Sequence, residues 1–167
     1  MALMFNSDEI LEMAIRIEAN GAAFYRKAAA MQSDAESKKF LEGLAAMEDQ
    51  HQRTFAEMRK TLTEADKGGK VFDPYNEESQ YLASMADTLG GEGSPTVADA
   101  LTGNETLEDI LRTALGLEKD SILFYLGLKD MVPASYGQEK IDKIIREEKR
   151  HVAQLAGLLK KVKDASP

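Results

Sequence analysis

The chain contains only two histidines, and each of them follows a glutamate by three residues. The pairs are Glu48–His51 and Glu148–His151, and the second lies 100 residues after the first. Side chains at positions i and i+3 of a helix lie on the same face, so each pair could reach one metal ion. A mixed set of carboxylate and imidazole ligands suits iron or manganese.

Two further glutamates and two tyrosines extend this repeat. Glu18 and Glu118 each precede the glutamate of a Glu-x-x-His pair by 30 residues. Tyr25 and Tyr125 follow these glutamates by seven residues, which is about two helical turns. All eight residues therefore form two sets with a constant offset of 100, which indicates an internal repeat at the level of helix hairpins.

The periodicity of apolar residues predicts the elements that would position these side chains. Four long helices are expected, over residues 8–32, 34–62, 107–131 and 138–163. We expect Ser7 to be the N-cap of the first helix and Thr106 that of the third. Ser33 and Glu36 form a capping-box signature at the start of the second helix.

The connections between these helices predict how they are arranged. The first two helices are joined by a short link, as are the last two, so each pair should form an antiparallel hairpin. Residues 63–105 are rich in Gly, Asp, Ser and Pro and contain a possible short helix at 77–87. The sequence therefore predicts a single all-α domain over residues 1–167, a four-helix bundle in which hairpins 7–62 and 106–163 are joined by a long crossover.

Each predicted helix carries a glutamate inside its apolar stripe, near the middle of the helix. A single Glu-x-x-His is usually a solvated helix face, but two of them in apolar stripes at matching intervals favour a metal site. Buried carboxylates are very costly without compensating positive charge, and two divalent cations would neutralise four of them. The predicted ligands of this two-metal site are Glu18, Glu48, His51, Glu118, Glu148 and His151.

Without metal, the four carboxylates should repel one another and raise the pKa of some of them. Removal of Glu148 is then expected to stabilise the metal-free protein.

On this doubled motif the chain resembles the ferritin-like superfamily, and most closely its rubrerythrin-like branch, over all four predicted helices. The resemblance implies a centre of two iron ions, with manganese or a mixed pair as alternatives. It implies that Glu48 and Glu148 bridge both ions, and that the two histidines supply the imidazole ligands. By the same resemblance, Glu18 and Glu118 are terminal carboxylates.

Two departures from the rubrerythrin pattern bear on function. Rubrerythrins usually carry a further ligand glutamate one turn after the third-helix ligand, where this chain has Ser121. Gly21 holds the matching place after Glu18, and these small residues could admit dioxygen or peroxide or permit close helix packing. The chain has no cysteine and so lacks a rubredoxin-like domain, and the resemblance then implies a separate electron-donor protein.

Tyr25 and Tyr125 are open to three interpretations. Each lies on the same helix face as its glutamate and could donate a hydrogen bond to a ligand carboxylate of the opposite hairpin. Each could instead take part in redox chemistry, or be an ordinary core tyrosine.

Composition excludes several classes of partner. A net charge of -8 and a pI of about 4.9 argue against binding to nucleic acid or to anionic membranes. No apolar run approaches the roughly 18 residues of a membrane span, and the N-terminus does not resemble a signal peptide. We therefore expect a cytoplasmic protein.

Three functions are compatible with these features. The first is a redox enzyme that reduces peroxide or dioxygen and is re-reduced by an external donor. The second is a ferroxidase that oxidises iron for storage in a shell, and the third is a non-enzymatic helical interaction module. We favour the first, because the crossover and the missing cage-specific signals resemble a storage ferritin less. A homodimer or another small homo-oligomer is expected.

Overall fold

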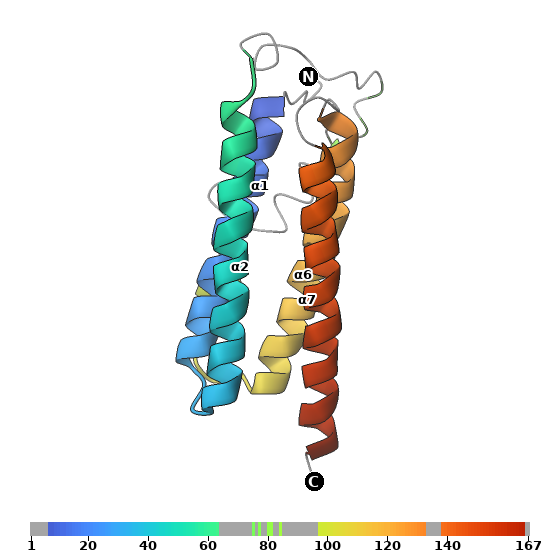
Figure 1. The fold of residues 1–167 in the computed structure, drawn as a ribbon. Helices are drawn as coiled ribbons and strands as arrows, with labels where there is room; N and C mark the ends of the chain where they lie inside the picture. Colours follow the sequence, from blue (N-terminus) through green and yellow to red (C-terminus); the bar gives the residue numbers. More distant parts are fainter. Residues whose placement is uncertain are drawn as a thin grey trace.

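The computed structural model describes residues 7–63, 75, 77, 80, 81, 84, 97–132 and 138–165. Its long helices are α1 (Ser7–Ala30), α2 (Ala35–Lys60), α6 (Leu107–Met131) and α7 (Gln138–Ala165). Figure 1 shows α1 and α2 as one antiparallel hairpin and α6 and α7 as the other, side by side in an elongated bundle. The predicted all-α four-helix bundle is thus confirmed.

The ends of the helices lie within two residues of the predicted boundaries. α1 and α2 end at Ala30 and Lys60, two residues earlier than predicted, and α7 runs two residues further, to Ala165. Differences of this size are usual, because the last turn of a helix frays. None of the described helices is both long and apolar enough to cross a membrane.

The start of α2 differs from the prediction, because its N-cap is Asp34. The Asp34 carboxylate accepts a hydrogen bond from the backbone N–H of Ser37 at 2.7 Å. An aspartate satisfies a free N–H and also brings the negative charge that the positive end of a helix dipole favours. The predicted capping box of Ser33 and Glu36 is therefore wrong by one residue. Ser7, predicted to cap α1, is the first residue of that helix.

α6 begins as the sequence predicts, with Thr106 as its N-cap. The backbone N–H of Asp109 donates to the Thr106 hydroxyl at 3.2 Å, and the backbone N–H of Thr106 donates to the Asp109 carboxylate at 2.9 Å. This reciprocal pair satisfies two backbone donors that would otherwise lack partners.

The apolar core consists of two clusters at different heights in the bundle. One combines the early part of α1, the late parts of α2 and α6 and the early part of α7, with Phe55 and Phe124 fully buried. The other combines the late part of α1, the early parts of α2 and α6 and Leu155 of α7, with Phe24 fully buried. Burial of each such phenylalanine contributes roughly 1.5–3 kcal/mol. Along every helix, the predicted ligands lie between the two clusters.

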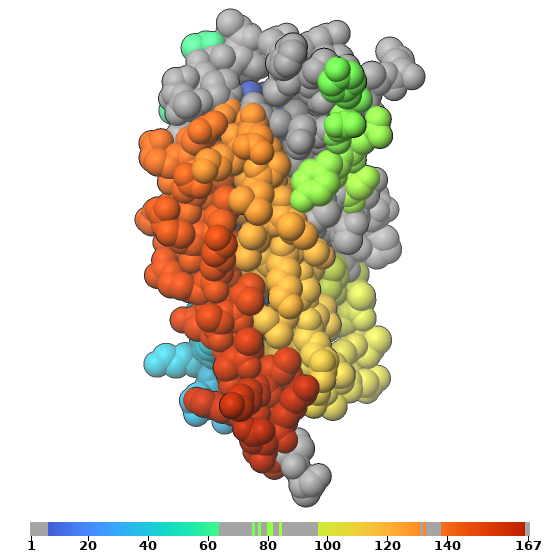
Figure 2. Space-filling model, turned by 90° about the vertical axis from the view of Figure 1, so that its right-hand side faces the viewer, coloured from blue at the N-terminus to red at the C-terminus, as the bar shows by residue number. Residues whose placement is uncertain are grey.

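The crossover contains the short helix α5 (Val97–Ala100), which the sequence did not predict. It contacts α1, where the Lys27 ammonium donates to the Ala98 carbonyl at 2.8 Å. Within the short helix predicted at 77–87, Glu77, Gln80, Tyr81 and Ser84 are helical, and the rest of that range lies outside the described residues. The Tyr81 hydroxyl donates to the Leu123 carbonyl at 2.9 Å, so this part of the crossover lies against α6 (Figure 2).

Candidate metal centre

The six predicted ligands converge between the two apolar clusters. α1 supplies Glu18, α2 supplies Glu48 and His51, and the other hairpin supplies the matching three. All are buried, with exposed fractions of 1% for Glu18, 5% for Glu48, 1% for His51, 3% for Glu118, 1% for Glu148 and 3% for His151. Bundle geometry thus gathers side chains up to 133 residues apart, from residue 18 to residue 151, into one buried layer.

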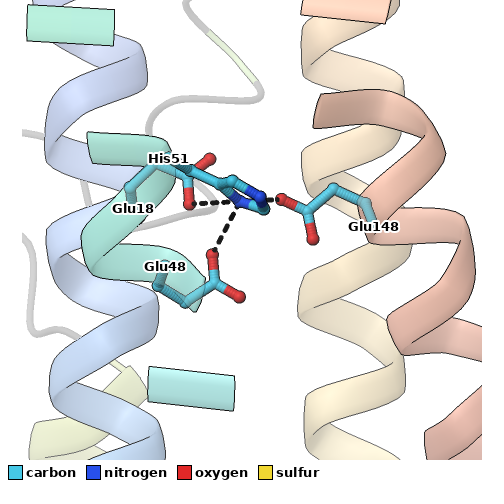
Figure 3. A group of neighbouring side chains, drawn as sticks. All are labelled: Glu18, Glu48, His51 and Glu148. Atoms are coloured by element: carbon cyan, nitrogen blue, oxygen red, sulfur yellow. Dashed lines mark ion pairs between the residues drawn. The ribbon is translucent and has the colours of Figure 1, made fainter. Parts of the chain in front are cut away.

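The first cluster surrounds His51. Its Nδ1 lies 2.9 Å from Glu148 Oε1, 3.5 Å from Glu18 Oε2 and 3.6 Å from Glu48 Oε2. Figure 3 shows these four side chains pointing toward one another, with Glu148 reaching across from α7 to the α1–α2 hairpin. One ligand atom from each residue can be chosen so that all lie within 4.8 Å of one another.

The second cluster surrounds His151 in the same way. Its Nδ1 lies 2.9 Å from Glu148 Oε2, 3.3 Å from Glu118 Oε2 and 3.6 Å from Glu48 Oε1. The two imidazole rings are stacked, with centroids 5.9 Å apart. Glu48 and Glu148 belong to both clusters, and each offers a different oxygen to each imidazole. Two ions held by these clusters would therefore share both carboxylates.

Unpaired polar atoms test whether the cluster suits metal ions. Glu48 Oε1, His51 Nδ1 and both carboxylate oxygens of Glu148 are buried without a hydrogen-bond partner. The His51 Nδ1 to Glu148 Oε1 contact is short enough for an ion pair, but it is not aligned as a hydrogen bond. Buried polar atoms are rarely left in this way. Buried ligand atoms that lack a hydrogen-bond partner and lie within 4.8 Å of one another are suited to a shared cation.

The family of this chain follows from its similarity to known proteins. The sequence matches the family described as the ferritin-like domain over residues 6–161. The chain belongs to the ferritin-like domain family. Its fold is similar to a crystal structure from Thermotoga maritima, described provisionally as a ferritin-like diiron-carboxylate protein, with a TM-score of 0.71 and 26% sequence identity. That match covers 95% of this chain and 97% of the other. Comparison with curated proteins gives no match.

In this ferritin-like chain without metal, charge on the imidazoles balances the buried carboxylates. Burial lowers the pKa of His51, but contacts with Glu148 and Glu18 outweigh burial and raise it. Burial also lowers the pKa of His151, but contacts with Glu118 and Glu148 outweigh burial and raise it to about 10. Both imidazoles therefore carry positive charge near neutral pH, and metal binding at Nδ1 would have to displace that proton.

Glu148 is the carboxylate that both imidazoles contact most closely. Burial acts to raise its pKa, but contacts with His151 and His51 outweigh burial and hold the pKa below its usual value. These contacts argue against the expectation that removal of Glu148 stabilises the metal-free protein. That expectation treated all four carboxylates as repelling one another, whereas Glu148 is the counter-ion of the charged imidazoles of His51 and His151.

Glu18 and Glu118 show the raised pKa that the sequence led us to expect for some of the carboxylates. Burial and then the charge of Glu48 raise the pKa of Glu18 well above its usual value. Burial also raises the pKa of Glu118, against the lowering effect of His151. Protonation of these two groups would limit the charge that the layer must accommodate in the metal-free protein.

The two tyrosines connect the hairpins. The Tyr25 hydroxyl donates to Glu118 Oε1, and the Tyr125 hydroxyl donates to Glu18 Oε1. Each reaches a carboxylate of the opposite hairpin, which confirms the first of the three interpretations. Burial, followed by the charge of the partner glutamate, raises the pKa of both phenols well above the usual value. They therefore remain hydrogen-bond donors.

The small residues after the terminal glutamates lie beside this layer. An added Cβ at Gly21 would lie 3.5 Å from Glu48 Cγ, which is ordinary van der Waals contact. Gly21 and Ser121 are both partly buried. An alanine would therefore fit at position 21, and the packing of α1 against Glu48 does not require a glycine there.

One residue of the site was missed by the sequence analysis. Glu147 Oε2 lies 3.0 Å from His51 Nε2, on the side of the ring that faces away from the cluster. The sequence carries one signal for Glu147, which is a break in the 100-residue repeat. The residue that corresponds to Glu147 in the first hairpin is Met47, so the carboxylate occurs in only one of the two sets.

Proposed function

We propose that this ferritin-like chain is a di-iron redox protein of the rubrerythrin-like type, which reduces peroxide or dioxygen with electrons from an external donor protein. The observation that carries the proposal is the sharing of Glu48 and Glu148 between two Glu/His clusters. The six ligands named from the sequence would hold the two ions. A bound diferrous pair supplies the two electrons which, with two protons, convert one peroxide molecule to two waters.

The chain itself prepares the site for this chemistry in three ways. Glu18 and Glu118 are held by the tyrosine hydroxyls, so their orientation does not depend on the metal alone. The two apolar clusters exclude water from the layer on both sides. Four carboxylates balance the charge of two divalent ions, which makes the loaded site less costly to bury than the empty one.

An anaerobic reconstitution experiment tests the proposal. The protein is loaded with ferrous iron, passed through a desalting column and mixed with one equivalent of hydrogen peroxide or with dioxygen-saturated buffer. We expect two ions to be oxidised per chain, to remain bound, and to return to the ferrous state when a reductant is added. Light scattering should report a dimer or another small oligomer.

Two results would reject this function in different ways. Retention of many more than two ions per chain as an oxide, in a large hollow particle, would establish iron storage. Failure to retain iron would leave a helical module without redox chemistry. The control is Glu139→Gln, which alters an exposed carboxylate at the start of α7 and should leave iron binding unchanged.

A further inference from the structure

The carboxylate of Glu147 lies outside the proposed ligand set but contacts one of its members. It is 3.0 Å from His51 Nε2, while the Nδ1 of the same ring faces the cluster. An imidazole that binds metal through one nitrogen donates a hydrogen bond from the other, and a carboxylate acceptor fixes the ring and makes it a stronger ligand. The side chain of Glu147 is 13% exposed, so water screens this contact only weakly.

Two cations on the outer side of α7 contact the other oxygen of Glu147. Arg150 lies 3.4 Å from Glu147 Oε1, and Lys143 lies 3.9 Å from the same atom. These contacts leave Oε2 directed at His51. Two cations therefore orient one carboxylate toward one ring.

The repeat does not provide His151 with a matching partner. Residue 47 stands where a second such carboxylate would be expected, and it is a methionine. Across the described part of the chain, the ion pairs of His151 are with Glu48, Glu118 and Glu148 of the cluster, and each is made by Nδ1. Met47 and His151 instead line the same groove between α2 and α7, beside Phe40 and Leu44. A thioether is only a weak acceptor, so the two imidazoles differ in their outer partners.

We infer that Glu147 is a positioning residue that makes the two metal positions unequal. The ion held by the His51 cluster binds more tightly and loads first, and the ion held by the His151 cluster follows. This inference rests on the proposed metal centre. Loss of such an outer partner typically lowers metal affinity by about 10–100-fold.

A titration of the metal-free protein with Co²⁺, followed by visible absorption in competition with a chelator, measures the two binding steps. The wild type should show a tight first step and a weaker second step. Glu147→Met gives position 147 the residue that the repeat has at 47, and it should weaken the first step by about 10–100-fold. Glu147→Gln keeps an acceptor for Nε2 and should retain more of the first-step affinity than Glu147→Met. Glu139→Met removes an exposed carboxylate from the same helix and should change neither step.

The outcomes separate this inference from the proposed function. A wild type that binds no Co²⁺ in the bundle would reject the metal centre itself. A wild type with two bound ions and a Glu147→Met variant with an unchanged first step would reject only the role of Glu147. The same conclusion would follow if Glu147→Gln were no better than Glu147→Met. The reciprocal change Met47→Glu keeps Glu147 intact, so it remains informative if Glu147→Met does not fold. It should tighten the second step, and no change there would contradict the inference.

Discussion

At the scale of single residues, Glu148 connects the charges of the metal-free core. Its two oxygens each lie 2.9 Å from an imidazole nitrogen, and its pKa is held below the usual value although it is buried. Removal of any one of these three groups would leave a buried charge without a partner. The residue proposed to bridge two metal ions is therefore also the counter-ion of the two charged imidazoles when no metal is bound.

The substitution Glu148→Ala should destabilise the metal-free protein. Loss of one partner of a buried ion pair typically costs about 3–5 kcal/mol, and ionisation of Glu18 or Glu118 can offset part of this loss. Urea denaturation in the presence of a chelator measures the change in the free energy of unfolding. A variant that is more stable than the wild type would show that carboxylate repulsion dominates the core.

The tyrosine hydrogen bonds make a second prediction. Tyr125→Phe leaves Glu18 Oε1 without its buried donor, so the free energy of unfolding should fall by about 1–3 kcal/mol. Tyr25→Phe should act in the same way through Glu118. The control is Tyr75→Phe, because Tyr75 is 80% exposed and its substitution should change stability by less than about 0.5 kcal/mol. Equal effects at all three positions would contradict the assigned hydrogen bonds.

The pKa of His151 predicts how the stability of the metal-free protein depends on pH. The folded value of about 10 lies above the ordinary value of 6.5. A raised folded pKa means that the folded state holds a proton that the unfolded state releases, so the contribution of His151 to stability is fully present below pH 6.5 and is lost toward pH 10. Denaturation at intervals across this range should show the decline. A constant or rising stability there would indicate that the imidazoles are neutral in the core.

At the scale of elements, the helices hold the ligand layer at a fixed height. Each helix carries an apolar stripe above and below its ligands, so the two clusters set the register of all four helices. α6 begins at Leu107, directly after its N-cap Thr106, and Glu118 lies about three turns into the helix.

Thr106→Ala removes the side-chain half of the capping box. The free energy of unfolding should fall by about 1 kcal/mol, since the backbone N–H of Asp109 loses its acceptor. Thr113→Ala provides the control, because Thr113 is exposed within α6, where alanine is the better helix former. Equal melting temperatures for Thr106→Ala and the wild type would show that the α6 N-terminus does not need this cap.

Much of this arrangement could be predicted from the sequence, because apolar periodicity and the doubled Glu-x-x-His pattern are strong local signals. The exceptions have physical reasons. Ser33 and Asp34 are both good N-caps, and only the observed hydrogen bond shows that Asp34 is used. The contact of Glu147 with His51 depends on the distance between α2 and α7, which periodicity does not give. The charge state of Glu148 depends on two imidazoles that approach it together.

At the scale of the whole molecule, the proposed centre joins the two hairpins. Each cluster takes ligands from both, and each tyrosine hydroxyl also reaches from one hairpin to the other. Metal bound only by the folded state would stabilise the bundle by about 2.7 kcal/mol when free metal is at 100 times its dissociation constant. Assembly of the bundle and loading of the site are therefore linked.

Anomalous scattering at the iron absorption edge, from crystals loaded anaerobically with ferrous iron, tests the dimetal centre most directly. The account predicts two peaks in the core. One should be enclosed by Glu18, Glu48, His51 and Glu148, and the other by Glu48, Glu118, Glu148 and His151. A single peak, or peaks confined to the acidic surface while the core shows none, would contradict the assignment of Glu48 and Glu148 as shared ligands of two ions.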